Sequence, residues 1–494
     1  MSSANRDTAP LRHPDRFFIG GEWVLPTSRK RIDVIQPATE EVYVTVADAS
    51  ADDMDRAIAA ARAAFDSGPW PRLTPKERAG YLRDIGMEIT RRAGELSHIW
   101  TSEMGIVHAI ARETVPGIGA AWTSYADLAD DFQFVERLQP QGGQVRLLAR
   151  EPVGVVGAII PWNGPLAIIA HKAAPALLAG CTVVLKMSPE APGAGYMMAE
   201  IAESVGLPPG VLNVITADRE VSEQLVSDAR VDKIAFTGST ATGRRIASIC
   251  AERIARYTLE LGGKSAALIL DDYDLATAAD SLSASTRRMT GQVCSALTRV
   301  IIDRRRHDDF VDALADSFSK IRVGDPFDDS TDMGPLAMQR QLDRVQQFIA
   351  AGVAGGAKLV TGGRRPPELN RGYFIEPTVF ADVDHRTQIA QEEIFGPVLS
   401  VIPAENLDEA IHIANDTIYG LNASVFTNHE DRAYEVSRAL RSGTVGHNAQ
   451  RADYGIAFGG FKQSGVGREG GREGLLTYLE TKAIILNGEP SELI

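Results

Sequence analysis

The fold is decided by the stretch V-G-V-V-G-A-I-I-P-W-N-G-P (153–165). Residues 153–160 form a continuous apolar run, which is typical of a strand covered on both faces of a parallel sheet. Pro165 can begin a helix that Gly180 ends, and a second apolar strand is expected at 182–186. A strand, a helix and a second strand in this order predict a parallel α/β sheet.

Alternation of strands and helices continues on both sides of Gly263. Further strands are expected at 210–215 and 233–237 before this glycine, and at 266–270 and 298–302 after it. The pattern therefore predicts two α/β lobes. Other elements are expected as a hairpin at 17–24, a strand at 398–402, and helices at 51–65, 75–93, 113–136, 192–205, 221–228, 275–290, 308–319, 339–351 and 407–414.

Composition limits the possible classes of protein. A chain of 494 residues is too long for one compact core, and a net charge of −14 argues against a nucleic-acid partner. Three cysteines, Cys181, Cys250 and Cys294, are too few for a disulfide framework, which favours a reducing compartment. The first residues contain no apolar core of a signal peptide, so we expect a cytoplasmic protein.

One segment resembles a membrane span by length alone. Residues 152–170 carry no charge and could cross a bilayer by their number. Pro161, Asn163, Gly164 and Pro165 lie in the middle, where they would break the helix and leave an amide in hydrocarbon. We therefore expect no membrane partner.

Two short motifs carry the chemistry. Cys294 ends G-Q-V-C (291–294), and Glu260 lies in T-L-E-L-G-G-K (258–264). A thiolate attacks a carbonyl carbon readily, and a carboxylate from a separate segment can then activate water. The pair indicates covalent catalysis on an aldehyde. Taken alone, each residue has an ordinary explanation, because a single cysteine is usually a small buried apolar residue and a glutamate can simply end a strand.

Several loops accompany this pair. Asn163 is expected at the carboxyl end of a strand, where α/β sheets bind ligands, and its amide could donate to a developing oxyanion. The turn F-T-G-S-T-A-T-G (236–243) leads from a strand into a helix, whose first N–H groups could receive a pyrophosphate, although it is not a G-x-G-x-x-G fingerprint. The other loops are E-E-I-F-G-P-V (392–398) and the glycine-rich F-G-G-F-K-Q-S-G-V-G-R-E-G-G (458–471).

Together these segments resemble the aldehyde dehydrogenase superfamily, from about Phe17 to the C-terminus. In chain order they are P-W-N, F-T-G-S-T, E-L-G-G-K, G-Q-V-C, E-I-F-G-P and F-G-G-F-K-Q-S-G. The resemblance implies an α/β fold with two parallel-sheet lobes and a small oligomerisation arm. It places the dinucleotide-binding domain at 1–129 and 149–261, the catalytic domain at 262–477, and the arm at 130–148 and 478–494.

The resemblance also implies the role of each site residue. Cys294 is the nucleophile, Glu260 is the general base, and Asn163 forms the oxyanion hole with the Cys294 backbone N–H. No metal site is implied. Cofactor contacts are implied for Ile160, Trp162, Lys186, Gly238, Ser239, Gly243, Leu261, Glu393 and Phe395. Substrate-channel positions are Gly164, Ile168, His171, Val293, Ser295 and Phe458.

Three departures from the family pattern concern the cofactor and the substrate. Members that favour NAD usually carry a glutamate at the position of Pro189, whereas here Glu190 comes one residue later. The loop 216–220 replaces a glycine-rich turn, and we expect its Arg219 to face water. NAD is the expected cofactor, with NADP as the alternative. Gly164 and His171 stand where aromatic residues are frequent, so we expect a wider and more polar channel.

We therefore expect an NAD(P)-dependent enzyme that oxidises a small-molecule aldehyde to the carboxylic acid and assembles as a homodimer or homotetramer. One alternative is a coenzyme-A-acylating dehydrogenase, although such relatives typically lack the glutamate that matches Glu260. A non-catalytic structural or binding protein of the same fold predicts an eroded site, and a cysteine hydrolase leaves the nucleotide loops unexplained. The sequence does not identify the aldehyde.

Overall fold

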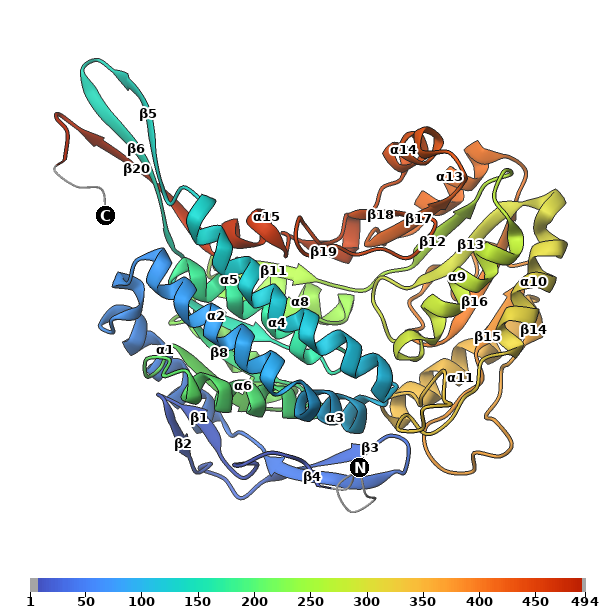
Figure 1. Cartoon of the computed structure of the whole chain (residues 1–494), viewed down its shortest axis with the longest axis horizontal. Helices are drawn as coiled ribbons and strands as arrows, with labels where there is room; N and C mark the ends of the chain where they lie inside the picture. Colours follow the sequence, from blue (N-terminus) through green and yellow to red (C-terminus); the bar gives the residue numbers. More distant parts are fainter. Residues whose placement is uncertain (1–7, 491–494) are drawn as a thin grey trace.

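The computed structural model describes residues 8–490, which form two α/β lobes and a protruding arm (Figure 1). The first lobe is built on an eight-stranded sheet. In spatial order its strands are β19 (Gly465–Val466), β11 (Arg256–Glu260), β10 (Lys233–Thr237), β7 (Val155–Ile159), β8 (Thr182–Met187), β9 (Leu212–Thr216), β1 (Phe17–Ile19) and β2 (Glu22–Val24). Strands β11 to β9 run parallel and the others form antiparallel edges, so the predicted parallel sheet is confirmed.

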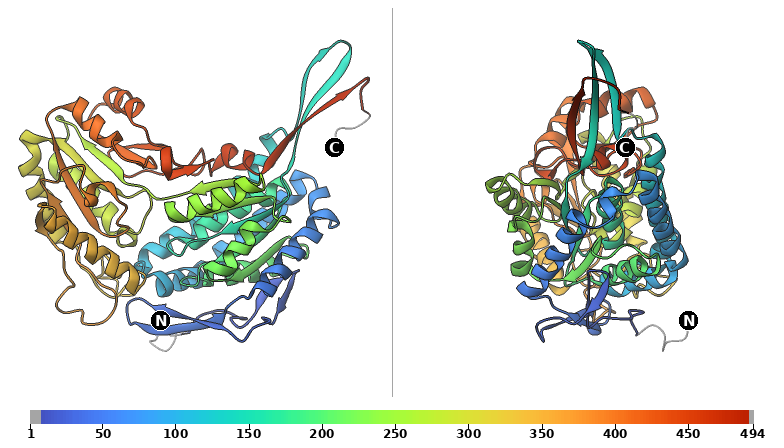
Figure 2. Two further views of the ribbon diagram at one scale, coloured as in Figure 1. Left: turned by 180° about the vertical axis from the view of Figure 1, so that it is seen from behind. Right: turned by 90° about the vertical axis from the view of Figure 1, so that its left-hand side faces the viewer.

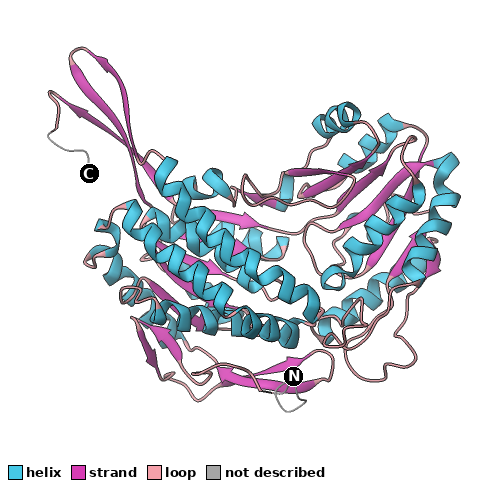
Figure 3. Ribbon diagram, viewed as in Figure 1, coloured by secondary structure: helices cyan, strands magenta, loops and turns pink. Residues whose placement is uncertain are grey.

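Helices cover both faces of this sheet (Figure 3). Along β8, Val183 and Leu185 point into one apolar core and Val184 into the other, which explains the uninterrupted apolar run. The helices of this lobe are α1 (Ala51–Asp66), η2 (Trp70–Arg72), α2 (Pro75–Arg91), α3 (Ala93–Met104), α4 (His108–Asp131), α5 (Pro165–Ala179), α6 (Gly193–Ser204), α7 (Arg219–Ser227) and α8 (Thr240–Glu252).

The second lobe contains a seven-stranded sheet. In spatial order its strands are β14 (Lys358–Thr361), β15 (Thr378–Ala381), β16 (Val398–Ala404), β13 (Leu297–Asp303), β12 (Ser265–Ile269), β17 (Asn422–Phe426) and β18 (Thr444–His447). All neighbours are parallel except β14 and β15. Its helices are α9 (Leu275–Arg287), η3 (Arg288–Gly291), η4 (Arg304–Arg306), α10 (His307–Ser319), α11 (Gln339–Ala354), α12 (Gln388–Gln391), α13 (Leu407–Asn415) and α14 (Glu430–Ala439).

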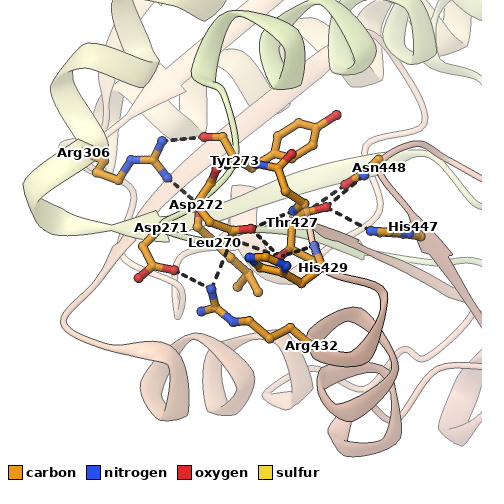
Figure 4. A network of polar contacts seen from close by, with 11 residues as sticks. Leu270, Asp271, Asp272, Tyr273, Arg306, Thr427, His429, Arg432, His447 and Asn448 are labelled. Atoms are coloured by element: carbon orange, nitrogen blue, oxygen red, sulfur yellow. Dashed lines mark hydrogen bonds and ion pairs between the residues drawn. The ribbon is translucent and has the colours of Figure 1, made fainter.

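A polar network connects neighbouring strand ends at the carboxyl edge of this second sheet (Figure 4). The Asp272 carboxylate, just after β12, accepts hydrogen bonds from the Thr427 hydroxyl at the end of β17 and from Arg432 of α14. Asn448, after β18, donates its side-chain amide to the Thr427 carbonyl oxygen. The network ties three neighbouring strand ends together, on the edge opposite the segment that carries Cys294.

The arm is a separate three-stranded sheet that projects from the first lobe (Figure 2). Its strands are β5 (Val135–Gln141), β6 (Gln144–Pro152) and β20 (Leu479–Leu486), and β6 pairs antiparallel with both others. The predicted boundary at residue 130 lies inside α4, and β6 continues beyond the predicted boundary at 148. Parts of the predicted domains, residues 1–7 and 491–494, lie outside the described residues.

Several elements differ from the sequence expectation. Helix α3 was not expected, and α4 begins at His108 and continues past Pro116 to Asp131, so the predicted helix at 113–136 is misplaced at both ends. Several further elements were not expected from the sequence. They are β14, β15, β17, β18, α14 and the two-stranded sheet of β3 (Arg31–Gln36) and β4 (Glu41–Ala47).

The glycine-rich segment after residue 457 returns to the first lobe. Strand β19 joins the first sheet beside β11, and Leu475 of α15 (Gly471–Leu476) packs in the first lobe's core. A short helix, η5 (Lys462–Ser464), precedes β19. Strand β18 is thus the last strand of the second sheet along the chain. The predicted catalytic domain, which runs to residue 477, therefore includes β19 and α15, which pack in the first lobe. None of the helices within residues 8–490 is long and apolar enough to cross a membrane.

Candidate active site

The predicted catalytic residues meet where the carboxyl edge of the first sheet faces the second lobe. Asn163 follows β7, Glu260 ends β11, and Cys294 lies between η3 and β13. These three segments are distant in sequence, and the parallel strands β7 and β11 bring the first two to the same edge.

The Cys294 loop is held in an unusual backbone conformation. Met289, Thr290 and Gly291 all have positive φ, which is costly for the two non-glycine residues. The Thr290 hydroxyl donates to the Gly334 carbonyl oxygen at 3.0 Å, and a Cβ at Gly291 would overlap the backbone of Gly396. The contact with the 392–398 motif therefore fixes the backbone position of the loop that carries Cys294.

Asn163 is fixed beside this loop. Its side-chain amide donates to the Gln292 backbone carbonyl oxygen at 3.0 Å. The backbone carbonyl oxygen of Asn163 accepts a hydrogen bond from the Trp100 indole N–H at 2.8 Å. Since an amide carries two N–H groups, the second remains for an oxygen formed near Cys294. This placement is compatible with the predicted oxyanion-stabilising role.

Electrostatics keep the Cys294 thiol protonated at neutral pH. Burial, together with the carboxylates of Glu393 and Glu260, raises the pKa of Cys294 to about 12. The thiol must therefore lose its proton to a neighbouring base before it can attack.

Glu260 is well suited to accept protons. Its side chain is buried, and among the described residues neither carboxylate oxygen has a hydrogen-bond partner. Burial and the nearby Glu469 raise its pKa well above the usual value, while Lys172 and Arg468 oppose this shift. A carboxylate without partners at neutral pH is costly unless it can hold a proton, as a general base does.

The sequence did not identify Lys172 and Glu469. They form a buried ion pair, since the side-chain exposures are 0% for Lys172 and 4% for Glu469. The pair lies near Glu260 and sets the charge there. Lys172 follows His171 on the otherwise apolar helix α5, and a lysine inside an apolar helix was the only signal in the sequence.

The turn between β10 and α8 is the place where the sequence predicts a diphosphate site. Ser239 caps α8 by accepting from the Thr242 N–H, and the first N–H groups of the helix have no intrahelical partner. The Thr237 hydroxyl is buried without a partner among the described residues. Gly243 instead has a packing role, because a Cβ there would overlap Leu261.

Lys186 lies near the end of β8, which is separated from β10 in the sheet by β7. It is buried, and burial lowers its pKa to about 8 although Glu190 and Asp218 raise it. The backbone carbonyl oxygen of Lys186 accepts a hydrogen bond from the Ile160 N–H at 3.0 Å. The Ile160 backbone therefore continues the pairing of β7 with β8.

The second lobe contributes Glu393 and Phe395. Glu393 accepts from the Gly263 N–H at 3.1 Å, and burial raises its pKa to about 7. The Phe395 ring packs edge-on against Trp162 with centroids 5.4 Å apart. Residues predicted to bind one cofactor thus come from both lobes and meet between them.

The expected channel residues divide into two groups. Gly164, Ile168 and Val293 are partly exposed, whereas His171, Ser295 and Phe458 are buried. The Ser295 hydroxyl accepts from Gln450 at 3.0 Å. Near Gly164 there is free space, since a Cβ there would meet only the terminal methyl of Met289, at 3.9 Å.

Tyr454 changes the expectation for His171. Its ring stacks on His171 at 3.8 Å with an interplanar angle of 10°, and on Phe458 at 4.5 Å. Burial lowers the pKa of His171 to about 3, so its ring is neutral. Tyr454 covers one face of the His171 ring, and the Nδ1 atom of His171 has no hydrogen-bond partner among the described residues, so the expected polar contact stays a prediction.

Alkylation of Cys294 by iodoacetamide is expected to accelerate with rising pH, because only the thiolate reacts and its pKa is raised. Glu260→Gln removes one of the two charges that raise this pKa, so the midpoint of the rate profile should move to lower pH. Mass spectrometry of the Cys294 peptide measures the rate. The exposed Glu252→Gln serves as the control, and an unchanged or higher midpoint in Glu260→Gln would contradict the coupling.

Known proteins are similar to this chain over most of its length. The model described as "Aldehyde dehydrogenase family" matches residues 23–484. A geranial dehydrogenase of Castellaniella defragrans is 44% identical over 473 residues, covering 96% of this chain and 98% of the relative.

Solved structures are similar over the same extent. An aldehyde dehydrogenase of Mycobacterium tuberculosis, complexed with NAD+, is 43% identical with a TM-score of 0.93, covering 97% of this chain and 99% of that chain. A mutant of aldehyde dehydrogenase C from Pseudomonas syringae, complexed with NAD+ and octanal, is 40% identical with a TM-score of 0.94, covering 99% and 100%. The similarity therefore includes both lobes and the arm.

Proposed function

The chain belongs to the aldehyde dehydrogenase family, and we propose that it oxidises an aldehyde to the carboxylic acid with NAD+ through a thioester on Cys294. One observation carries the proposal: Glu260, a buried carboxylate with no partner among the described residues, lies close enough to Cys294 to raise the pKa of its thiol.

The first half-reaction uses Cys294 and Asn163. The thiol passes its proton to a nearby carboxylate, and the sulfur attacks the aldehyde carbon to form a thiohemiacetal. The free N–H of the Asn163 amide and the Cys294 backbone N–H donate to the resulting oxyanion. NAD+ supplies the hydride acceptor when bound. Loss of hydride from the carbon leaves a thioester on Cys294.

The second half-reaction uses Glu260. Glu260 first releases the proton taken from the thiol to solvent. Its carboxylate then takes a proton from water, the hydroxide attacks the thioester carbon, and the carboxylic acid leaves while the proton on Glu260 returns to the cysteine sulfur. Burial and the nearby Glu469 raise the pKa of Glu260, although Lys172 opposes this shift, and the raised pKa favours proton uptake.

The residues between the two lobes suit NAD+. The first turn of α8 would receive the diphosphate, Lys186 the adenosine ribose, and Glu393 the nicotinamide ribose. Phe395 and Trp162 would enclose the nicotinamide. The unpartnered Thr237 hydroxyl and the open N–H groups of α8 are the groups that such a ligand would satisfy.

A coenzyme-A-acylating enzyme is the closest alternative. Steady-state turnover without any thiol acceptor, with free carboxylic acid as the product by chromatography, tests the proposal. Turnover that requires coenzyme A and yields a thioester product would replace it.

We propose an aldehyde with a long carbon chain as the substrate. One relative is a geranial dehydrogenase, one similar structure holds octanal, and the space beside Gly164 could admit such a chain. We also propose, on the family resemblance, that the chain assembles into a homodimer or homotetramer through the projecting arm. The three free cysteines support the proposal of a cytoplasmic location.

Gly164→Phe is expected to lower kcat/KM for octanal by about 10- to 100-fold, because the new ring would occupy the open side of the channel. For acetaldehyde the value should hold or rise. Gly164 has φ of −138°, so a side chain causes no backbone strain. Gly164→Ala is the control and should change little. An equal loss on both substrates would show that Gly164 does not line the channel.

A further inference from the structure

Trp100 lies behind the candidate active site, on helix α3. Its side chain is buried, and its indole N–H donates to the backbone carbonyl oxygen of Asn163 at 2.8 Å. The two residues are 63 positions apart, so this hydrogen bond joins α3 to the loop that follows β7. No step of the proposed reaction assigns a role to Trp100, although it contacts the residue that carries the oxyanion donor.

The peptide that accepts this hydrogen bond lies just outside α5. The Gly164 carbonyl oxygen accepts the first helical hydrogen bond, from the Ile168 N–H, so the Asn163 carbonyl lies one residue before the helix. A glycine on its C-terminal side restricts rotation of this peptide less than any other residue would. The indole N–H of Trp100 therefore supplies a constraint that the loop itself lacks.

The side chain of Asn163 is held from the opposite direction. Its amide donates to the Gln292 backbone carbonyl oxygen at 3.0 Å. The buried Gln292 side chain is itself fixed, because it donates to the Met289 carbonyl oxygen at 3.1 Å and accepts from the Ala337 N–H at 3.0 Å. With the backbone and the side chain both held, the second amide N–H of Asn163 has a defined direction.

Helix α3 also supports the loop that carries the nucleophile. Gly105 ends the helix with a φ of 83°, and a Cβ on Gly334 would overlap the Gly105 carbonyl oxygen. The Gly334 carbonyl oxygen in turn accepts from the Thr290 hydroxyl at 3.0 Å. The same helix thus contacts the oxyanion donor directly and the Cys294 loop through Gly334.

We propose that Trp100 is a positioning residue for the oxyanion hole. Its indole N–H holds the Asn163 backbone so that the free amide N–H points at the oxygen formed beside Cys294. Donors of an oxyanion hole act only within narrow limits of distance and angle. Without the indole N–H, the buried Asn163 carbonyl loses this partner, which favours rotation of the peptide. The inference rests on the proposed function, because it assumes attack of the Cys294 thiol on a carbonyl carbon.

Trp100→Phe removes the N–H and keeps an aromatic ring. This change should lower kcat for octanal by about 10- to 100-fold, because the lost alignment is needed in the transition state. The KM for octanal and the calorimetric dissociation constant of NAD+ should change little. Trp122→Phe is the matched control, since Trp122 is buried and its indole N–H has no hydrogen-bond partner among the described residues. Its turnover should equal that of wild type.

A double variant separates positioning from general damage. Asn163→Ala alone should lower kcat by about 10²- to 10³-fold. Trp100→Phe should add little to this loss, because its effect passes through the Asn163 amide. Losses that add in full, or an unchanged kcat in Trp100→Phe, would overturn the proposal. If Trp100→Phe does not fold, benzothienylalanine at position 100 replaces the N–H by sulfur at nearly the same shape and should give the same losses.

Release of p-nitrophenol from p-nitrophenyl acetate, without NAD+, provides a second readout. The Cys294 thiol attacks the ester carbonyl, forms an oxyanion at the same place and expels the phenolate, with no hydride transfer. The rate should fall in Trp100→Phe and not in Trp122→Phe. Wild type that cleaves the ester but does not oxidise aldehydes would contradict the proposed function, and the rate in Trp100→Phe would still decide the positioning role.

Discussion

Cys294→Ala is expected to lower aldehyde oxidation by about 10⁴-fold or more, because no other group can form the thioester. NAD+ binding should remain, since the proposed nucleotide contacts lie on β8, the β10–α8 turn and the 392–398 segment. Turnover is measured by absorbance of the reduced cofactor, and binding by calorimetry.

Cys250→Ala is the matched control. Cys250 is buried in α8 and contributes only to the core, so turnover should be retained at a temperature where the variant is folded. Full activity in Cys294→Ala, or an equal loss in both variants, would contradict the role of Cys294.

Glu260→Gln is expected to separate the two half-reactions. Hydride transfer precedes the attack of water, and hydrolysis needs the base, so steady-state turnover should fall by about 10²- to 10⁴-fold. Rapid mixing should show a burst of reduced cofactor that approaches one per active subunit. The burst is expected to be clearest at high pH, because there the cysteine can ionise without Glu260.

Glu252→Gln provides the control, since this glutamate is exposed at the end of α8. It should leave both the burst and the steady state as in wild type. A Glu260→Gln enzyme with unchanged steady-state turnover would show that Glu260 only supports the structure.

The fold was predictable where local pattern and burial agree. Residues 153–160 and 182–186 are apolar because β7 and β8 are covered on both faces. Strand β19 could not be predicted, since it has only two residues and exists only through its pairing with β11. Helix α4 continues through Pro116, which a local rule would place at a helix boundary.

The sequence motifs predicted which residues form the candidate site, but not which charged and aromatic side chains surround them. Motifs identified Cys294, Glu260 and Asn163, because each lies in a short sequence segment that can be read without the fold. The ion pair of Lys172 and Glu469 joins α5 to the distant glycine-rich segment, so no sequence spacing reveals it. Tyr454 was missed for the same reason, because its contact with His171 depends on the packing of that segment against the first lobe.

The central claim is that Cys294 carries the acyl group and Glu260 releases it. Intact-protein mass spectrometry of Glu260→Gln, quenched in acid after mixing with octanal and NAD+, tests both parts at once. We predict a mass increase equal to one acyl group, located on the Cys294 peptide and removed by hydroxylamine. Formation of reduced cofactor without this adduct, or an adduct on another residue, would contradict the account.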